Sequence, residues 1–557
     1  MTRSKLFVLP FTVSIAIVAA CAACSPSDGP ETGSQTNWLI ACESSRECGA
    51  LECICGACTA PCQSDSACAE LPGGVCVAAS DRRSLALCAG QAPRSLCLPN
   101  CEPACGEGTS CVAGVCAPIA GPSVRVSIDP GVLHQTLTGF GASLAFADDA
   151  IVAHPDKAAL YDLLFAQSGL DVLRLRNRYE EASRSALLPA REIVAEAAHR
   201  LGRQPLLFMT SGSPPPALKA NGSRMCGGDP ESCTLVSLPG GGFDYARFAD
   251  YWRASLDAYL NAGIAPDYVS IQNNPNWVPP ADSPNHACRF LPMEGTTTVT
   301  VAGTAIEVAY PGYREALAAV RAAISDLPVM PKLGAPEVSG LGAVSEYVSP
   351  LDAAAFDALA LHLYGVNKKA VDVAPLGVVR DLAQRLDRPV FQTEMQAGGL
   401  ETAVLIHHAL TAGGASAYLQ NDLVSLTPEM APVALALLTR DGFEAQGPYY
   451  ALSQYAKHTD PGWVRVDATS DSSELLGSAW LAPDESALTI VLINPGAQDL
   501  EAELVLPAAL RARFTRTEVT RTVFDGFERA AVLGELPAHG RVRLPSRSIL
   551  TAALARE

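Results

Sequence analysis

The stretch Ala358–Gly365 reads ALALHLYG, a short apolar run that ends in two polar ring side chains, His362 and Tyr364. A run of this length is typical of a strand that is buried on both faces of a parallel sheet. Seven more runs of this kind occur along the chain: QTLTGFGAS, LDVLRLR, PLLFMTSG, DYVSIQN, KLGAPE, PVFQTEM and SAYLQNDL. The chain therefore contains eight candidate strands.

Segments with helical periodicity separate several of these runs. Between residues 247 and 262, apolar residues recur at every fourth position (Phe248, Trp252, Leu256 and Leu260) and mark one buried helical face. Eight strands separated by helices over roughly 300 residues fit a (β/α)8 barrel better than an open doubly wound sheet. We therefore predict an α/β fold with a barrel over residues 122–450.

The pattern changes after residue 450. Segments such as WVRVDA, LTIVLINP and AELVLP alternate apolar and polar residues, which is typical of half-buried strands. They predict a C-terminal β-sandwich over residues 451–557. A short strand at residues 122–130, just ahead of the first barrel strand, is expected to join it.

Polar residues stand where several barrel strands are expected to end. In such barrels the functional side chains lie at the carboxyl ends of the strands. Each of these residues alone has an ordinary structural explanation, so only their convergence on one face predicts a site. The residues are Arg174, Arg176, Gln272, Asn273, Asn274, Glu337, His362, Tyr364, Gln392, Thr393 and Glu394.

The N-terminus has the features of an export signal. Arg3 and Lys5 precede an apolar run of roughly 15 residues that ends in small residues. Val18-Ala19-Ala20-Cys21 resembles the lipobox of bacterial lipoproteins, which makes Cys21 the predicted lipidation site within a signal peptide of residues 1–21. Cys24 is the alternative lipidation site, and an ordinary secreted protein is the alternative to a lipoprotein. Residues 22–40 form a polar tether.

A cysteine-rich module is predicted over residues 41–118. It holds fourteen cysteines between Cys42 and Cys116 and no histidine. An even cysteine number in an exported chain indicates disulfides rather than the zinc site that Cys53, Cys55 and Cys58 would otherwise suggest. In the barrel, Cys226 and Cys233 are expected to pair. Cys288 is then either free or paired with a cysteine of the module.

The charge and the histidine pattern exclude several partners. The net charge of -18, without any Lys/Arg-rich run, argues against nucleic acid binding. The nine histidines are scattered, and His407 and His408 point to different faces of a helix, so no metal site is predicted. We expect no cofactor, and no membrane contact beyond an N-terminal lipid anchor. The oligomeric state is not predicted.

Taken in order, the motifs resemble those of glycoside hydrolase family 30, which includes glucuronoxylanases and glucosylceramidase-type enzymes. The matching pieces are QTLTGFGAS, GLDVLRLRN, GSPPPALKANG, YVSIQNNPNW, LGAPE, LHLYG, FQTEM and YYALSQYAKHTDPGWVRV. They extend from about residue 124 to the C-terminus, roughly three quarters of the chain. The resemblance implies a barrel flanked by a β-sandwich, a polysaccharide or glycoside substrate, and retaining hydrolysis of β-glycosides.

The resemblance also implies roles for individual residues. Glu394 matches the family nucleophile, and Asn273 matches the asparagine that bonds the sugar 2-hydroxyl. His362, Tyr364 and Arg174 match residues that position and polarise the nucleophile. Trp277 is the tryptophan that remains beside the site.

The chain departs from the family pattern at the acid/base position. Where the family reads Gln-Asn-Glu-Pro, this chain has Asn274, and an amide cannot donate a proton at neutral pH. Asn276 also stands where an aspartate is common. Aromatic residues usual in the family are replaced as well, at Gly212, Ala217 and Asn421.

Two functions fit this pattern, and the hydrolase is favoured narrowly because of the family resemblance. A hydrolase would use Glu394 and take its proton from Asp282, from Glu294 or from the substrate, or would need none with a good leaving group. The alternative is a catalytically inactive surface lipoprotein that binds a glycan. A barrel without a sugar ligand ranks last. If the rest of the site is intact, Asn274→Glu should raise activity.

Overall fold

The structure is a computed structural model that describes most of the chain from residue 123 onward and part of the N-terminal region. The described residues are 45, 48, 51–55, 57–71, 74–80, 84, 88, 93–99, 109–112, 115–118, 123–144, 146–179, 187–301, 303–526, 528–537 and 539–556. The predicted signal peptide, the tether and both candidate lipidation sites, Cys21 and Cys24, lie outside the described residues.

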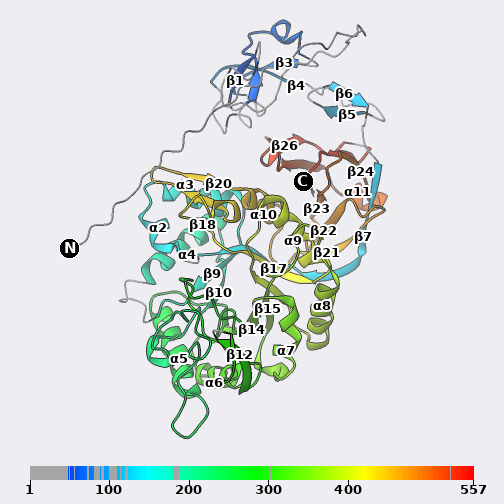
Figure 1. Cartoon of the computed structure of the whole chain (residues 1–557). Helices are drawn as coiled ribbons and strands as arrows, with labels where there is room; N and C mark the ends of the chain where they lie inside the picture. Colours follow the sequence, from blue (N-terminus) through cyan, green and yellow to red (C-terminus); the bar gives the residue numbers. More distant parts are fainter. Residues whose placement is uncertain are drawn as a thin grey trace, which may run out of the picture.

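All eight predicted barrel strands form, and they close into a parallel barrel (Figure 1). The first and last strands pair through Phe140 and Tyr418, which closes the ring. This confirms the (β/α)8 barrel. Around the barrel the strands are β8 (Gly139–Ser143), β9 (Val172–Arg176), β10 (Leu206–Thr210), β11 (Tyr268–Ser270), β14 (Lys332–Val338), β15 (Ala358–His362), β16 (Val390–Glu394) and β17 (Ala415–Gln420).

The barrel interior is filled by large rings set against small residues. Phe208, Tyr268 and Phe391 pack there with ring centroids 4.9 to 6.5 Å apart. A Cβ atom at Gly141 would lie 1.9 Å from the carbonyl oxygen of Val172, so β8 and β9 can approach this closely only at a glycine. Such close packing fixes the strand ends, and with them the functional face.

Helices cover the outside of the barrel (Figure 1). The predicted helix at residues 247–262 is α5, which buries Phe248, Trp252 and Leu256 as the periodicity indicated, and Asp244 caps it by accepting from the Arg247 amide. The helices are α2 (Asp148–Ala153), α3 (Lys157–Tyr161), α4 (Leu188–Leu201), α5 (Tyr245–Asn261), α6 (Tyr313–Ile324), α7 (Val344–Val348), α8 (Ala374–Leu386), α9 (Gly399–Thr411) and α10 (Gly447–Ala456).

The C-terminal strands form a nine-stranded sheet with its own core. The predicted early strand is β7, longer than expected, and it lies between β21 and β24 in this sheet. Val124, Ile490 and Leu544, from strands far apart in the order, share one apolar core, so the sheet folds over itself as a sandwich. In sheet order the strands are β26 (Ala531–Gly534), β25 (Arg516–Val523), β28 (Ser548–Ala555), β23 (Ala487–Asn494), β22 (Leu476–Leu481), β21 (Val464–Ser470), β7 (Ser123–Thr136), β24 (Leu500–Val505) and β27 (Arg541–Leu544).

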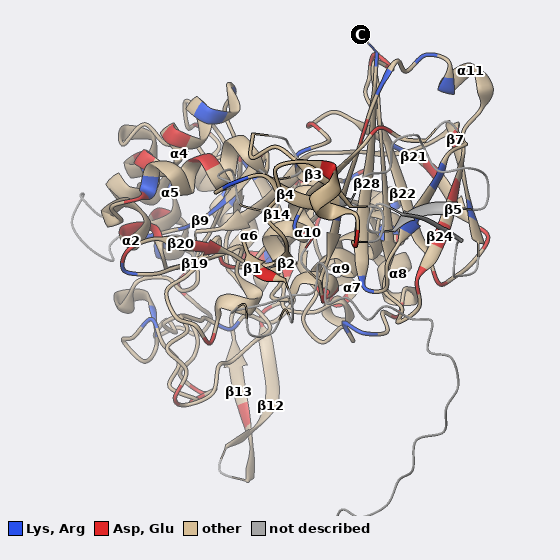
Figure 2. Cartoon of the chain, turned by 90° about the horizontal axis from the view of Figure 1, so that it is seen from above, with Lys and Arg blue, Asp and Glu red and all other residues tan. Residues whose placement is uncertain are grey.

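Two smaller sheets were not predicted. The hairpin β12 (Gly295–Val301) and β13 (Thr304–Tyr310) is inserted between β11 and α6 and projects from the barrel (Figure 2). A three-stranded sheet of β18 (Val424–Ser425), β19 (Ala436–Leu438) and β20 (Phe443–Ala445) follows the last barrel strand.

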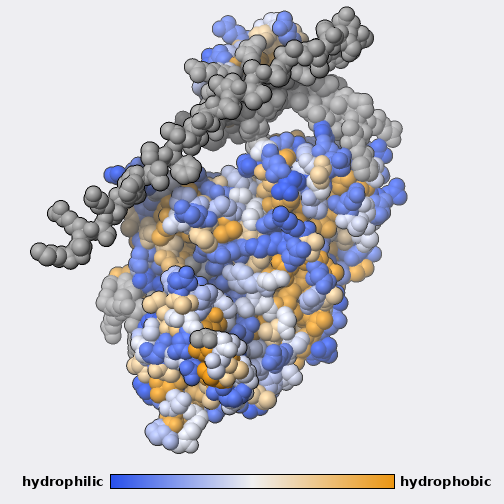
Figure 3. Space-filling view, viewed as in Figure 1, coloured by the Kyte–Doolittle hydropathy of each residue, from blue (hydrophilic) through white to orange (hydrophobic). Residues whose placement is uncertain are grey.

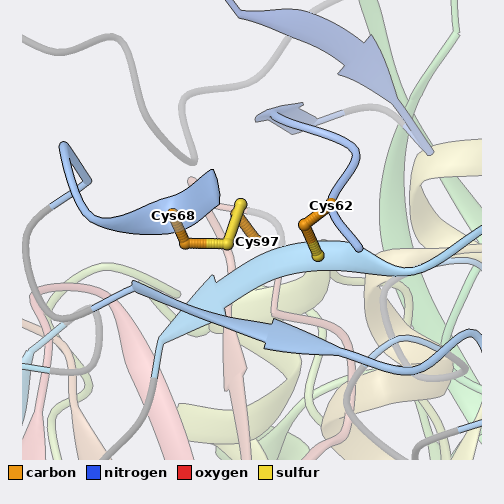
Figure 4. A group of neighbouring side chains, drawn as sticks. All are labelled: Cys62, Cys68 and Cys97. Atoms are coloured by element: carbon orange, nitrogen blue, oxygen red, sulfur yellow. A yellow bond between two sulfur atoms is a disulfide. The ribbon is translucent and has the colours of Figure 1, made fainter. Parts of the chain in front are cut away.

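The described part of the N-terminal module consists of short antiparallel strand pairs joined by disulfides. Cys62, Cys68 and Cys97 lie close enough together to suggest a metal site, yet Cys68 is bonded to Cys97 (Figure 4). Cys62 is bonded to Cys76. Disulfide sulfurs are not thiolate ligands, and Cys55 and Cys58 of the zinc alternative are bonded in the same way, so the disulfide prediction is confirmed. The other described pairs are Cys48–Cys58 and Cys55–Cys88. The strands are β1 (Glu52–Ile54), β2 (Ala57–Thr59), β3 (Gly74–Val77), β4 (Leu96–Pro99), β5 (Thr109–Val112) and β6 (Val115–Pro118).

The barrel cysteines also follow the prediction. Cys226 and Cys233 form a disulfide, and Cys288 is a free, buried thiol. The outer surface mixes hydrophilic and hydrophobic residues on the face seen in Figure 3. Among the described residues, no helix has the length and apolar character needed to cross a bilayer.

Candidate active site

Glu394 ends β16 at the carboxyl face of the barrel, and both of its carboxylate oxygens are held. Arg174 Nη1 lies 2.9 Å from Oε2, and the Tyr364 hydroxyl donates to Oε1 at 2.8 Å. Glu394 is 7% exposed, so its carboxylate is nearly enclosed by these partners. Burial and the adjacent Glu394 charge raise the pKa of Tyr364, which keeps its hydroxyl protonated as a donor.

Arg174, at the middle of β9, connects three of the predicted site residues. It pairs with Glu394, donates from Nη2 to Asn273 Oδ1 at 2.7 Å, and contacts Glu337 Oε1 through Nε at 3.1 Å and Nη2 at 2.9 Å. Because Arg174 fixes Oδ1 of Asn273, this amide presents Nδ2 as a hydrogen-bond donor. One buried guanidinium therefore organises two carboxylates and one amide.

Glu337 is a completely buried counter-ion. Burial alone would raise its pKa, but the Arg174 charge, His362 and the Thr210 hydroxyl outweigh burial and lower the pKa to about 2. Thr210 Oγ1 donates to Oε2 at 2.5 Å. A carboxyl group that remains ionised to such low pH cannot serve as an acid near neutrality, so Glu337 does not fit the role of a proton donor.

Asn274, the residue predicted to replace the acid/base carboxylate, has its side chain turned onto His362. His362 Nδ1 lies 2.9 Å from Asn274 Oδ1, and because an amide oxygen only accepts, Nδ1 donates. The Nε2 atom of His362 is 3.6 Å from Glu337 Oε1, longer than a hydrogen bond. Asn274 has a left-handed backbone (φ 48°), and its amide nitrogen donates to the Glu337 carbonyl oxygen at 3.1 Å.

The neighbouring residues of the YVSIQNNPNW stretch make contacts that join this segment to other parts of the barrel. Gln272 donates to the carbonyl oxygen of Gly212 at 2.8 Å. Asn276 donates to Ser339 Oγ and accepts from the Ser339 amide, which ties this loop to the end of β14. Trp277 is half-buried, and its amide donates to the Asn274 carbonyl oxygen at 3.0 Å. The structure thus brings Asn273 and Asn274 to the site centre, with Trp277 following them.

A loop fills the space beside Gly212, where the family usually has a tryptophan. A Cβ atom at Gly212 would lie 3.1 Å from the Cβ of His286, so a large side chain at that position would collide with this loop. His286 in turn meets the Phe146 ring edge-on, and the Arg176 guanidinium lies 4.4 Å above Phe146. Phe146 is 57% exposed and offers an aromatic face that the motif analysis missed.

The Cys226–Cys233 disulfide belongs to the framework of this loop. The buried Lys219 donates from Nζ to the Ala287 carbonyl oxygen at 2.5 Å, next to His286. Burial lowers the pKa of Lys219. Lys219 and the disulfide both belong to the loop after β10. This loop therefore holds the loop after β11 against the barrel.

The two loop carboxylates considered as proton donors, Asp282 and Glu294, are both exposed. Glu294 is exposed and accepts from the Tyr245 hydroxyl at 2.7 Å, beside the β12–β13 hairpin. Asp282 is exposed on the loop after β11. Within the described part of the chain, neither carboxylate forms an ion pair or hydrogen bond with Arg174.

Asp422 is a carboxylate near the site that the motif analysis did not weigh. It follows β17 directly, in a left-handed conformation (φ 69°). Its Oδ2 accepts a hydrogen bond at 3.0 Å from Nε2 of Gln396, which lies two residues after Glu394. The sequence signal was present in SAYLQNDL, but only Asn421 was examined there.

The fold can now be compared with known proteins. No family model and no curated protein matches the sequence. A xylanase of glycoside hydrolase family 30 subfamily 8 from Clostridium acetobutylicum aligns with a TM-score of 0.59 and 21% identity, over 77% of this chain and 99% of that chain. A conserved exported protein from Bacteroides fragilis aligns with a TM-score of 0.59 and 18% identity, over 77% of this chain and 100% of that chain. An endo-β1,6-glucanase aligns with a TM-score of 0.55 and 14% identity, over 78% of this chain and 94% of that chain.

These similarities establish the class of fold. The chain has a glycoside hydrolase family 30-like architecture, a barrel with a flanking β-sandwich, as the order of motifs predicted. At identities near 20% the likeness concerns the fold, and activity has to be argued from the site.

Proposed function

We propose that this protein is an exported glycosidase that cleaves β-linked glycans by a retaining mechanism, with Glu394 as the nucleophile. The observation that supports this best is the hydrogen-bonded carboxylate of Glu394 at a barrel strand end, held by Arg174 and Tyr364. A residue kept only for folding has no need of a charge placed at the opening of a barrel. The fold similarity to xylanases and a glucanase supports a polysaccharide substrate.

The site residues fit the first step of such a mechanism. Glu394 attacks the anomeric carbon and forms a glycosyl ester while the bond to the leaving oxygen breaks. Arg174 and Tyr364 each hold one oxygen of the attacking carboxylate and so orient it. Asn273 Nδ2 is the donor for the sugar 2-hydroxyl, a bond that gains strength as charge develops on the sugar ring. Trp277 and Phe146 offer rings for stacking on sugars.

The amide of Asn274 limits the catalytic rate of this site, because it cannot protonate the leaving group. General acid catalysis contributes about 10² to 10⁴ in rate, so a site without a donor would favour substrates whose leaving group needs no proton. The contact between Asn274 and His362 also supports the second candidate, a surface protein that binds a β-glycan without cleaving it. Both candidate functions use the same residues at the barrel face, and they differ in whether the bound glycan is cleaved.

The product configuration tests the hydrolase proposal. Dinitrophenyl β-xyloside and β-glucoside require no acid, so wild-type protein should hydrolyse one of them, and Glu394→Ala should fall to the background rate. Azide added to Glu394→Ala should yield the α-glycosyl azide, because azide then attacks in place of the carboxylate. Glu294→Ala, an exposed control, should match the wild type. Folded protein that binds β-glycans without turnover would favour the binding candidate.

Export and anchoring form a separate part of the proposal. The disulfides of the N-terminal region indicate an oxidising compartment, and one structural neighbour is described as an exported protein. We propose lipidation at Cys21, with Cys24 as the alternative. Cells given a labelled fatty acid should incorporate it into the wild type and not into Cys21→Ser. Label that persists in Cys21→Ser and disappears in Cys24→Ser would move the site to Cys24.

A further inference from the structure

The Asp422 side chain stands beside the predicted nucleophile. The Asn421 amide donates to the Met395 carbonyl oxygen at 2.8 Å, directly after Glu394, and the Leu423 amide donates to the Ser143 carbonyl oxygen at 2.7 Å. Asp422 is thus clamped between the ends of β16 and β8 on the functional face. Its carboxyl group accepts from Gln396, which ties Asp422 to the loop that follows β16.

Asp422 differs from the other site carboxylates in lacking a cationic partner. Arg174 pairs with both Glu337 and Glu394, whereas no ion pair of Asp422 is found among the described residues. Partial burial with a single amide donor leaves little to hold its charge. A carboxyl group in such surroundings tends to keep its proton, which is the requirement for an acid.

We propose that Asp422 donates the proton to the leaving oxygen, in place of the carboxyl group lost at Asn274. This rests on the proposed hydrolase function. In the first step Glu394 bonds to the anomeric carbon, the glycosidic bond breaks, and the Asp422 proton passes to the leaving oxygen. In the second step Asp422 takes a proton from water, the water oxygen bonds to the anomeric carbon, and the ester to Glu394 breaks.

The charges around Asp422 favour this exchange of roles. Burial raises the pKa of Asp422 to about 6, Gln396 opposes the shift, the Glu394 charge adds to it, and Arg174 opposes it. Tyr364 is a neutral donor to Glu394, and Lys368 contacts the Gln396 carbonyl oxygen. Formation of the ester removes the Glu394 charge and therefore lowers the pKa of Asp422. The acid of the first step then becomes a carboxylate base for the second.

The Asp422→Asn variant tests the proposal, because asparagine tolerates the same left-handed backbone. On unactivated β-linked oligosaccharides, kcat/KM should fall by about 10² to 10⁴. On dinitrophenyl glycosides the first step should be little affected, and azide should speed turnover because it needs no base. The wild-type profile should lose activity as pH rises through about 6, and this limb should be absent in the variant. Asp387→Asn, another left-handed aspartate, is the matched control.

The outcomes separate this inference from the proposed function. Glu394-dependent turnover with an unchanged Asp422→Asn variant, including its pH limb, would overturn the role of Asp422 and leave the hydrolase intact. Absence of Glu394-dependent turnover on every substrate, activated ones included, would overturn both. A loss that is equal on activated and unactivated substrates, without any azide effect, would show that Asp422 is structural.

Discussion

Asn274→Glu, introduced into the Asp422→Asn variant, is expected to raise kcat/KM for unactivated β-glycosides by about 10² to 10⁴. The new carboxyl group would stand next to His362, at the position where the family resemblance places the acid of a retaining mechanism. In the wild-type background the gain should be smaller, because two acids then serve the same leaving oxygen. Initial rates on β-linked oligosaccharides measure the effect.

The matched control is Asn274→Gln, which has the same length as glutamate and no acidic proton. It should give no gain. An equal gain for both substitutions would mean that size rather than acidity matters at this position. If neither variant gains activity while both remain folded, the changed cleft wall around Gly212 and His286 limits the reaction more than the missing acid does.

Arg174→Met is expected to lower the free energy of unfolding by about 3 to 5 kcal/mol, because it leaves the buried carboxylates of Glu337 and Glu394 without their cation. The loss should be smaller at acid pH. In the wild type the pKa of Glu337 is about 2, so its stabilising contribution is present above about pH 4.3 and is lost as pH falls toward 2. Without Arg174, burial would raise this pKa. Denaturant unfolding at pH 7 and pH 4 measures the difference.

Two further variants show whether the pairing is the cause. Arg440→Met removes an exposed arginine and should change stability by less than about 0.5 kcal/mol. Adding Glu337→Gln to Arg174→Met should recover part of the loss, because the amide removes the unpaired charge. Additive losses in the double variant would contradict the account of Arg174 as the shared counter-ion.

The fold was predictable because barrel strands carry a strong local signal. Each of the eight strands is a short apolar run, and runs such as ALALH and VFQTE end in the residues that reach the site. The meeting of Glu394 and Tyr364 followed from their positions at or just beyond strand ends, whereas Arg174 reaches Glu394 from the middle of β9. The Cys226–Cys233 pair followed from short spacing in an exported chain.

Other features depend on long-range contacts that no local pattern carries. The complete burial of Glu337 arises from Arg174 and Thr210, which lie on other strands. Asp422 acquires its environment from its left-handed backbone and from Gln396, which lies two residues beyond the end of β16. His286 occupies the space beside Gly212 only because the loop after β11 folds back, which a missing aromatic residue alone does not indicate. The β12–β13 hairpin lies in a segment read as loop.

The most direct test of the central claim is covalent labelling of the nucleophile. Wild-type protein is incubated with dinitrophenyl 2-deoxy-2-fluoro-β-xyloside or the matching glucoside, which form a long-lived glycosyl ester and need no acid. Peptide mass spectrometry should find one added fluoroglycosyl group on Glu394, and no label in Glu394→Gln. A label on another carboxylate, or none on folded protein that binds the sugar, would contradict Glu394 as the nucleophile.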